Sequence, residues 1–293
     1  MVPPGAQADH LVMGEDLHPI RDTRPRDLLA VAANAPGVYR VLRRLRPAAV
    51  VSTGAAAAVP ALGIASALGV ECHYVESAAR TEGPSLTGRL LEPIPGLRCY
   101  SQWPGWPKRS WPVPGGVFDG FTPEARGPGR TIARVVVTLG TQPRYGFRRA
   151  VERLHGLLPS DAEVLWQVGS TDVAGLPIAG HRIIPPAQLR RALASADLVV
   201  AHAGVGSALG ALAEGKCPVL LPRERDHGEH VDDHQAQVAR AIDRLGLAVG
   251  RHVEELTIED LHRAASTAVL RTPAAALRLG GRLGQALALG ETR

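Results

Sequence analysis

Short apolar runs alternate with longer segments of helical periodicity along most of this chain. Strand-like runs occur at Ala48–Ser52, Glu71–Val75, Leu97–Ser101, Val135–Leu139, Val164–Val168, Ile183–Ile184, Leu198–Ala201 and Pro218–Pro222. Runs of this length are typical of strands that are buried on both faces of a parallel sheet. Their alternation with helix-like segments, such as Ser85–Leu91, predicts an α/β fold built from doubly wound sheets.

The alternation breaks at Gln102–Pro128, which is rich in Trp, Pro and Gly and therefore predicts an interdomain loop. We expect a first domain at residues 1–118, a linker at 119–132, a second domain at 133–293 and a terminal helix at Ala274–Leu289. The segment Asp27–Arg46 predicts a basic amphipathic helix, broken or kinked at Pro36. A core-facing helix with a solvated basic side explains it better than a helix that rests on an anionic bilayer.

A glycine-rich turn follows the strand at Leu198–Ala201 and leads into a helix. Glycines allow the backbone to turn tightly with its N–H groups aimed outward. The unpaired N–H groups and the dipole of such a helix N-terminus attract anions. We therefore predict a diphosphate site at Gly204, Val205, Gly206 and Ser207, with an ordinary helix cap as the alternative.

A dense set of charged and amide side chains, Arg223–Gln235, follows the next strand. The segment lies where open α/β sheets bind ligands, at the carboxyl end of a parallel strand. Carboxylate and amide groups suit sugar hydroxyls, although a solvated loop has the same composition.

The histidines of this segment are spaced in a way that could suggest a metal site, at His227, His230 and His234. Two nearby cationic side chains, Arg223 and Arg225, would oppose a cation. We therefore expect no metal here.

Composition narrows the classes of protein that this chain can represent. Its 293 residues suffice for two domains, with 4% aromatic and 21% charged residues, as in soluble α/β proteins. There is no apolar run of about 18 residues and no signal-peptide core at the start, so we expect a cytoplasmic protein. The three cysteines show no CxxC spacing and are expected to be reduced.

The chain has a net charge of +5 and a pI near 9.5. This charge suits anionic nucleotide sugars and phospholipid surfaces. No nucleic-acid-binding motif accompanies it, so we expect no nucleic-acid partner.

Several motifs, in order, resemble glycosyltransferase family 28. HAGVGS, GKCPVLLPR and EHVDDHQ, within residues 133–250, resemble its donor-binding half, as in the catalytic subunit of two-subunit dolichol-pathway N-acetylglucosaminyltransferases. VVSTGAAAAVPALGIASALG, YVESAAR and PSLTGRLLEP, within residues 40–120, resemble the membrane-associated partner subunit and bacterial exopolysaccharide transferases. The chain thus resembles both subunits fused in one polypeptide.

The resemblance implies the GT-B architecture, in which two Rossmann-like domains face a cleft and the last segment, here 274–293, crosses back to the first domain. It also implies a metal-independent transferase that needs no cofactor. Such an enzyme would move a sugar, with inversion, from a UDP-sugar to a polyprenyl-diphosphate-linked saccharide at the cytoplasmic membrane face, in peripheral contact with anionic lipid. Two alternatives stay open: a nucleotide-sugar 2-epimerase, and a non-catalytic donor-binding or scaffolding subunit.

The resemblance also assigns donor residues. The sugar is expected at Glu229, His230, Asp233, His234 and Gln235, and the uracil at the backbone of Ile184. Gly140, Thr141 and Gln142 follow a strand and, by topology, face the same ligand as the glycine-rich turn. An ordinary strand-to-helix turn explains these three residues equally well.

The first domain is expected to bind the acceptor. Glu76 is the candidate general base, with a structural pairing to Arg80 as an equal alternative. The candidate acceptor residues are Ser52, Thr53, Gly54, Ser77, Arg80, Ser85, Thr87 and Arg89, where arginine suits phosphate oxygens. For Ser85–Arg89, a plain surface helix is the alternative.

Members of this family normally begin with a strand and a glycine-glycine-histidine loop, and this sequence begins downstream of both. The expected explanations are an internal start site, loss of the segment or its supply by a separate polypeptide. We also expect an unpaired place in the first sheet, with exposed backbone groups.

Overall fold

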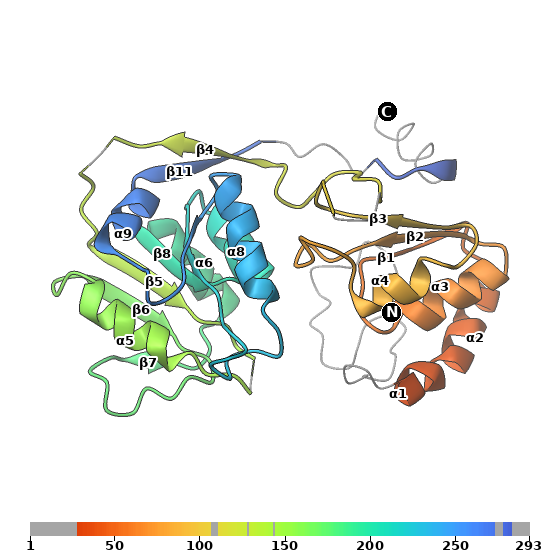
Figure 1. Cartoon of the computed structure of the whole chain (residues 1–293), viewed down its shortest axis with the longest axis horizontal. Helices are drawn as coiled ribbons and strands as arrows, with labels where there is room; N and C mark the ends of the chain where they lie inside the picture. Colours follow the sequence, from red (N-terminus) through yellow and green to blue (C-terminus); the bar gives the residue numbers. More distant parts are fainter. Residues whose placement is uncertain (1–27, 107–110, 128, 143, 273–277, 283–293) are drawn as a thin grey trace. The chain divides into compact units, whose positions relative to one another are not determined.

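The computed structural model describes residues 28–106, 111–127, 129–142, 144–272 and 278–282 (Figure 1). The chain divides into two compact units, one made of Met1–Gly116 with Ala276–Arg293, the other of Val117–Ala275. Most of the terminal helix expected at 274–289 lies outside the described residues.

The first unit contains a parallel sheet in the order β1-β2-β3. Its elements are α1 (Leu28–Ala33), α2 (Ala35–Leu45), β1 (Ala49–Ser52), α3 (Ala58–Ala67), β2 (Glu71–Val75), α4 (Leu86–Leu91) and β3 (Leu97–Tyr100). The three predicted strands are therefore confirmed. Leu62, Tyr74 and Leu91 are fully buried and form part of the core of this unit.

The basic helical segment is broken at Asn34, between α1 and α2. Pro36 lies in the first turn of α2, where a missing N–H leaves no intrahelical bond unmade. Val38 and Leu42 of α2 are buried, whereas Arg40 and Arg43 are exposed. The helix thus has a core-facing apolar side and a solvated basic side.

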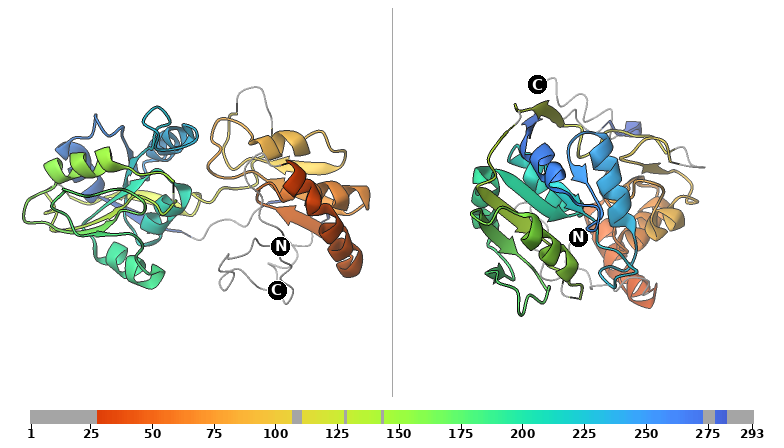
Figure 2. Two further views of the ribbon diagram at one scale, coloured as in Figure 1. Left: turned by 90° about the horizontal axis from the view of Figure 1, so that it is seen from below. Right: turned by 60° about the vertical axis from the view of Figure 1, so that its left-hand side comes forward.

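The second unit is built on a six-stranded parallel sheet in the order β10-β9-β8-β5-β6-β7. Its elements are β4 (Phe121–Ala125), β5 (Arg134–Thr138), α5 (Arg148–Leu157), β6 (Glu163–Gln167), β7 (Gly180–His181), α6 (Pro186–Ser195), β8 (Leu198–His202), α7 (Val205–Ala213), β9 (Val219–Leu221), α8 (His234–Arg244), β10 (Val249–Gly250), α9 (Ile258–Ala265) and β11 (Thr267–Arg271). Helices α5 and α6 lie on opposite sides of the sheet (Figure 2). The unit is therefore doubly wound, as predicted.

The strand order reverses between β5 and β8. From β5 the chain proceeds outward through β6 to β7, and from β8 it proceeds the other way through β9 to β10. Thr138 of β5 pairs with Ala201 of β8, so the carboxyl ends of the two strands lie side by side. Such a switch point is where open α/β sheets bind their ligands.

Two expectations about the second unit need correction. The segment expected as a linker at 119–132 contains β4, which pairs antiparallel with β11 and so belongs to the sheet structure of this unit. Ile183–Ile184 is not a strand, because β7 is limited to Gly180–His181. The prolines that follow, Pro185 and Pro186, have no N–H for a sheet ladder, and Pro186 instead begins α6.

Within the described part of the chain, every helix is too short to cross a bilayer. The longest of them, α2 and α8, have 11 residues each, whereas a spanning helix needs about 20.

Candidate functional site

The glycine-rich turn after β8 forms the N-terminus of α7. Gly204 is the N-cap residue, in an extended conformation, and it has no side chain that could cap the helix. The first-turn N–H groups therefore have no intrahelical acceptor. A Cβ atom added to Gly206 would meet nothing within 4 Å, so the backbone here is open to a ligand. Gly204, Val205, Gly206 and Ser207 thus form the N-cap and first turn of α7, and their contact with a diphosphate stays a prediction.

The ring of His202, the last residue of β8, lies directly beside this turn. A Cβ atom added to Gly204 would come 2.5 Å from the ring Nε2, and one added to Gly140 would come 3.0 Å from the same atom. The His202 Nδ1 lies 3.3 Å from the hydroxyl of Ser207. Both glycines are therefore needed to make room for this ring.

Burial of the His202 ring, and next the charge of Arg223, lower the pKa of His202 to about 4. The ring is therefore neutral at physiological pH and offers a hydrogen bond to an anion without adding a positive charge. His202 was not among the residues predicted from the sequence. The signal that marks it is a polar side chain at the end of an apolar strand, immediately before the glycine-rich turn.

The loop after β5 also lies at this switch point. Gly140 has a φ of +81°, and its carbonyl oxygen would lie 1.9 Å from a Cβ atom added to Gly169. This close approach between the loops after β5 and β6 requires glycine at both positions. The side chains of Thr141 and Gln142 are exposed, and their contact with the donor stays a prediction.

Arg223 is a buried cation that joins the ends of two strands. Its side chain donates to the carbonyl of Leu139 through Nη2, and its backbone N–H donates to Oε1 of Gln235 at 3.1 Å. Burial lowers the pKa of this guanidinium. Its Nε is buried without a partner in the described residues. From the sequence, Arg223 was expected only to oppose a metal ion through its charge.

Glu229 has a different environment from the one predicted. Its carboxylate is buried and accepts from Arg149 of α5 through both oxygens, at 2.9 Å each. The backbone N–H of Glu224 also donates to it, at 3.2 Å. These contacts favour a role in holding the loop rather than in reading a sugar. Arg149 lies outside the polar segment, which is why the sequence did not reveal it.

Two further residues that were predicted to bind the sugar, Asp233 and Gln235, already accept hydrogen bonds from the backbone of the same segment. Asp233 is exposed, and its Oδ1 accepts from the backbone N–H of Arg225 at 2.9 Å. Gln235 lies in the first turn of α8, with its side-chain oxygen on Arg223. The second carboxylate oxygen of Asp233 and the side-chain NH₂ of Gln235 are the groups proposed for sugar hydroxyls.

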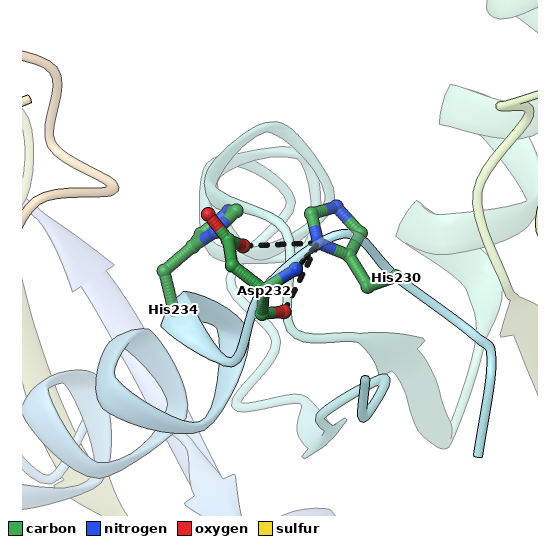
Figure 3. A group of neighbouring side chains, drawn as sticks. All are labelled: His230, Asp232 and His234. Atoms are coloured by element: carbon green, nitrogen blue, oxygen red, sulfur yellow. Dashed lines mark hydrogen bonds and ion pairs between the residues drawn. The ribbon is translucent and has the colours of Figure 1, made fainter. Parts of the chain in front are cut away.

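His230 and His234 both point toward Asp232 (Figure 3). The Nδ1 of His230 lies 3.1 Å from Oδ1 of Asp232, and the Nδ1 of His234 contacts the same oxygen. The three ligand atoms lie within 4.8 Å of one another, which is close enough to hold a metal ion. His227, the third histidine that the sequence considered, is instead 3.5 Å from Glu224.

The backbone N–H of Ile184, the predicted uracil contact, already has a hydrogen-bond partner. Its N–H donates to Oε1 of Gln167 at 2.9 Å, and the Gln167 amide in turn donates to Thr138 at 3.0 Å. The Ile184 side chain is buried. A uracil contact at this position can therefore use the Ile184 carbonyl but not its N–H.

In the first unit, Glu76 is not the free carboxylate expected of a general base. It is 1% exposed and accepts from the hydroxyl of Tyr74 at 2.9 Å and from the backbone N–H groups of Ser77 and Ser85 at 2.9 and 2.8 Å. A base must reach the proton that it removes. These contacts favour a structural role, with partners that differ from the Arg80 considered as the alternative, and the catalytic role of Glu76 stays a prediction.

The remaining acceptor candidates gather at the carboxyl ends of β1 and β2 and on α4. Ser85 is the N-cap of α4 and accepts from the N–H of Gly88 at 3.1 Å. Ser52 accepts from the N–H of Gly54 at 3.3 Å. These serines thus have local structural roles. Side chains of four others are exposed or partly exposed: Thr53, Ser77, Thr87 and Arg89.

A family comparison matches residues 134–276 to the glycosyltransferase family 28 C-terminal domain. A UDP-N-acetylglucosamine–N-acetylmuramyl-(pentapeptide) pyrophosphoryl-undecaprenol N-acetylglucosamine transferase of Cupriavidus necator is 28% identical over 75% of this chain and 64% of its own length. The enzyme of the same name from Thermus thermophilus is 29% identical over 80% of this chain and 73% of its own length. The chain thus spans less than two thirds of the first of these relatives.

Solved structures agree on the fold. MurG of Acinetobacter baumannii aligns with a TM-score of 0.55 and 19% identity, over 84% of this chain and 74% of its own. The glycosyltransferase SnogD of Streptomyces nogalater aligns with a TM-score of 0.52 and 21% identity, over 80% and 69%. These similarities confirm the GT-B type of fold, with two Rossmann-like units.

Proposed function

Because this chain belongs to glycosyltransferase family 28 through its residues 134–276, we propose that it transfers a sugar, with inversion, from a UDP-sugar to a polyprenyl-diphosphate-linked saccharide. We propose UDP-N-acetylglucosamine as the donor, and the cytoplasmic face of the membrane as the place of reaction. The names of the two relatives, which include this donor and a pyrophosphoryl-undecaprenol acceptor, support the proposal.

The observation that carries the proposal is the open N-terminus of α7 beside the neutral ring of His202. Transfer leaves a nucleoside diphosphate whose negative charge must be stabilised. Unpaired N–H groups at the α7 N-terminus and the helix dipole supply that stabilisation. The free space at Gly206 permits the diphosphate to approach the backbone.

The polar segment after β9 completes the donor site in this proposal. Arg149 pairs with Glu229, and the backbone N–H of Arg223 donates to Gln235. Both contacts hold this segment in place. Asp233 and the amide of Gln235 then meet the hydroxyls of the sugar. The general base for the acceptor is left unassigned, since Glu76 is fully engaged by its own neighbours.

A second candidate function is a donor-binding subunit without activity of its own. The engagement of Glu76 favours it, because no other general base has been assigned among the acceptor candidates.

Radiolabelled UDP-N-acetylglucosamine, incubated with the full chain and a polyprenyl-diphosphate-linked muramyl saccharide, tests the proposal. Label that moves into the lipid fraction supports the transferase. Isomerised sugar without acceptor would identify the 2-epimerase, and UDP binding without turnover would identify the binding subunit. Absence of UDP binding by calorimetry would overturn the donor site itself.

A further inference from the structure

The loop before α8 and the first residue of that helix carry a cluster of possible metal ligands: His230, Asp232 and His234. Two of them, His230 and His234, were expected at the donor sugar, which the proposed function leaves to Asp233 and Gln235. We propose that these three residues form a binding site for a divalent transition-metal cation of the Zn²⁺ class, with one ligand atom from each residue. The site is separate from the proposed diphosphate site, at which no metal is expected.

Convergence of the three donor atoms is the first argument. Both imidazoles direct Nδ1 at the same carboxylate oxygen, with the His230 nitrogen at 3.1 Å. All three ligand atoms lie within 4.8 Å of one another. A Zn²⁺ ion binds nitrogen and oxygen ligands at about 2.0–2.2 Å, so small side-chain rotations suffice to place one ion among them.

The side chains are already held in place for such an ion. The side chain of His230 is 9% exposed and that of His234 is 21% exposed. The two rings pack edge to face, with centroids 4.8 Å apart, and Tyr145 packs against His230 at 5.8 Å. Asp232 is 40% exposed, which leaves a path for the ion and space for a water ligand. Preorganised ligands lose less conformational entropy when the ion binds.

The electrostatic surroundings permit a cation. The N-terminus of α8 is unfavourable, since a helix N-terminus carries about half a positive charge. Asp232 and the N-cap residue Asp233 bring two negative charges to the same turn. The guanidinium of Arg223 is committed to Leu139, and that of Arg149 to Glu229. The side chain of Arg225 is exposed, so solvent screens its charge. The two carboxylates thus oppose the cationic surroundings from which the sequence predicted that no metal binds.

Two imidazoles and one carboxylate also determine which metals fit. Imidazole suits Zn²⁺, Cu²⁺, Ni²⁺ and Co²⁺, whereas Mg²⁺ and Ca²⁺ prefer oxygen ligands. With three protein ligands, one coordination position stays open for water. Selectivity against Mg²⁺ is thus part of the proposal.

Titration of the untagged full chain with Co²⁺ and Zn²⁺ tests the site. Co²⁺ should produce visible d–d absorption that one equivalent of Zn²⁺ abolishes, and Mg²⁺ should produce no response. Asp232→Asn and His234→Ala should each weaken Zn²⁺ binding at least about tenfold in calorimetry. The matched control is His227→Ala, which removes an exposed histidine of the same loop from outside the cluster.

Three outcomes would overturn the proposal: no Co²⁺ or Zn²⁺ binding to the wild-type chain, unchanged affinity in both cluster variants, or an equal loss in the His227→Ala control. Asp232→Asn preserves the shape of the side chain, so circular dichroism and urea unfolding of this variant separate loss of ligand from loss of fold. The experiment measures metal binding alone. A negative result therefore contradicts the metal site and does not bear on the proposed transferase activity.

Discussion

Arg149 on α5 contacts both carboxylate oxygens of Glu229, at 2.9 Å each, although the two residues are 80 positions apart in the chain. Both side chains are largely buried. Removing one partner of a buried ion pair leaves an uncompensated charge. We expect Arg149→Met to lower the free energy of unfolding by about 3 kcal/mol, measured by urea denaturation.

The adjacent ion pair supplies the control for this prediction. Arg148 pairs with Glu152 on the exposed surface of the same helix, at 2.7 Å. Arg148 also donates to the carbonyls of Asp172 and Ala174, so the control is Glu152→Gln, which should change the free energy of unfolding by only about 0.5 kcal/mol or less. Similar losses in both variants would contradict a special role for the Arg149–Glu229 pair, and restored stability in the double variant Arg149→Met/Glu229→Leu would support it.

Gly206 offers a direct test of the diphosphate site. Its φ is not in the left-handed region and an added Cβ meets nothing within 4 Å, so Gly206→Leu should fold. The larger side chain should prevent the diphosphate from reaching the α7 backbone. We expect the calorimetric affinity for UDP to fall at least about tenfold, or about 1.4 kcal/mol. Unchanged affinity in the folded variant would remove this turn from the donor site.

Gly204→Ala should behave differently from Gly206→Leu, because its Cβ would lie 2.5 Å from Nε2 of His202. The expected effect is a loss of stability rather than a selective loss of UDP affinity. The two glycines of one motif thus have separable roles: one makes room for a side chain, and the other makes room for a ligand.

Much of the fold was predictable because the strands are marked by local patterns. Buried strands such as β5 and β8 are read directly from apolar runs. The predictions of strands failed where a local pattern has another cause or where the partner strand is distant in the sequence. Ile183–Ile184 is apolar because Ile184 fills the core from a loop, and β4 has an exposed, proline-containing sequence whose partner, β11, lies far away in the chain.

The candidate site was predictable for backbone groups and less so for side chains. A glycine-rich turn after a strand is enough to predict where exposed backbone N–H groups lie, as at Gly204–Ser207. The environment of a carboxylate, in contrast, depends on its partners in the tertiary structure. Glu76 receives a hydrogen bond from Ser85 and Glu229 pairs with Arg149, and no pattern within either segment reveals these contacts.

The oxygen and the NH₂ group of the Gln235 side-chain amide have different partners. A substitution can therefore remove one of these contacts and keep the other, which alanine cannot do. Its Oε1 accepts from the Arg223 N–H at 3.1 Å, while its NH₂ is proposed to donate to the donor sugar. Gln235→Glu keeps the acceptor and removes the donor. We expect a loss of about 0.5–1.5 kcal/mol for the intact UDP-sugar and nearly unchanged affinity for UDP, measured by calorimetry on the same variant. Equal losses for both ligands would place Gln235 at the nucleotide or in the fold.

His202 predicts a specific dependence of stability on pH. Its pKa is lowered from 6.5 to about 4 by burial, then by Arg223, with His230 also contributing. Between these two values the unfolded chain binds a proton that the folded chain does not. The stabilising contribution is therefore complete above about pH 6.5 and is lost as the pH falls through about 4.

Urea unfolding between pH 4.5 and 7 measures this contribution. His202→Gln should reduce the slope of unfolding free energy against pH by up to about 1.4 kcal/mol per pH unit within the window. A slope identical to that of the wild-type chain would show that the His202 ring titrates in the folded state as it does in the unfolded one.

Removal of metal should leave the diphosphate site intact even if the His230–Asp232–His234 cluster binds Zn²⁺. The cluster belongs to the loop before α8, whereas the diphosphate is expected at the N-terminus of α7. There the backbone N–H groups and the helix dipole, rather than a cation, offset the phosphate charge. Calorimetric affinity for UDP should therefore be the same in EDTA and in buffer with added Mg²⁺, to within about twofold. A strict requirement for Mg²⁺ would instead show that a cation bridges the diphosphate, and would contradict the assignment of this charge to α7.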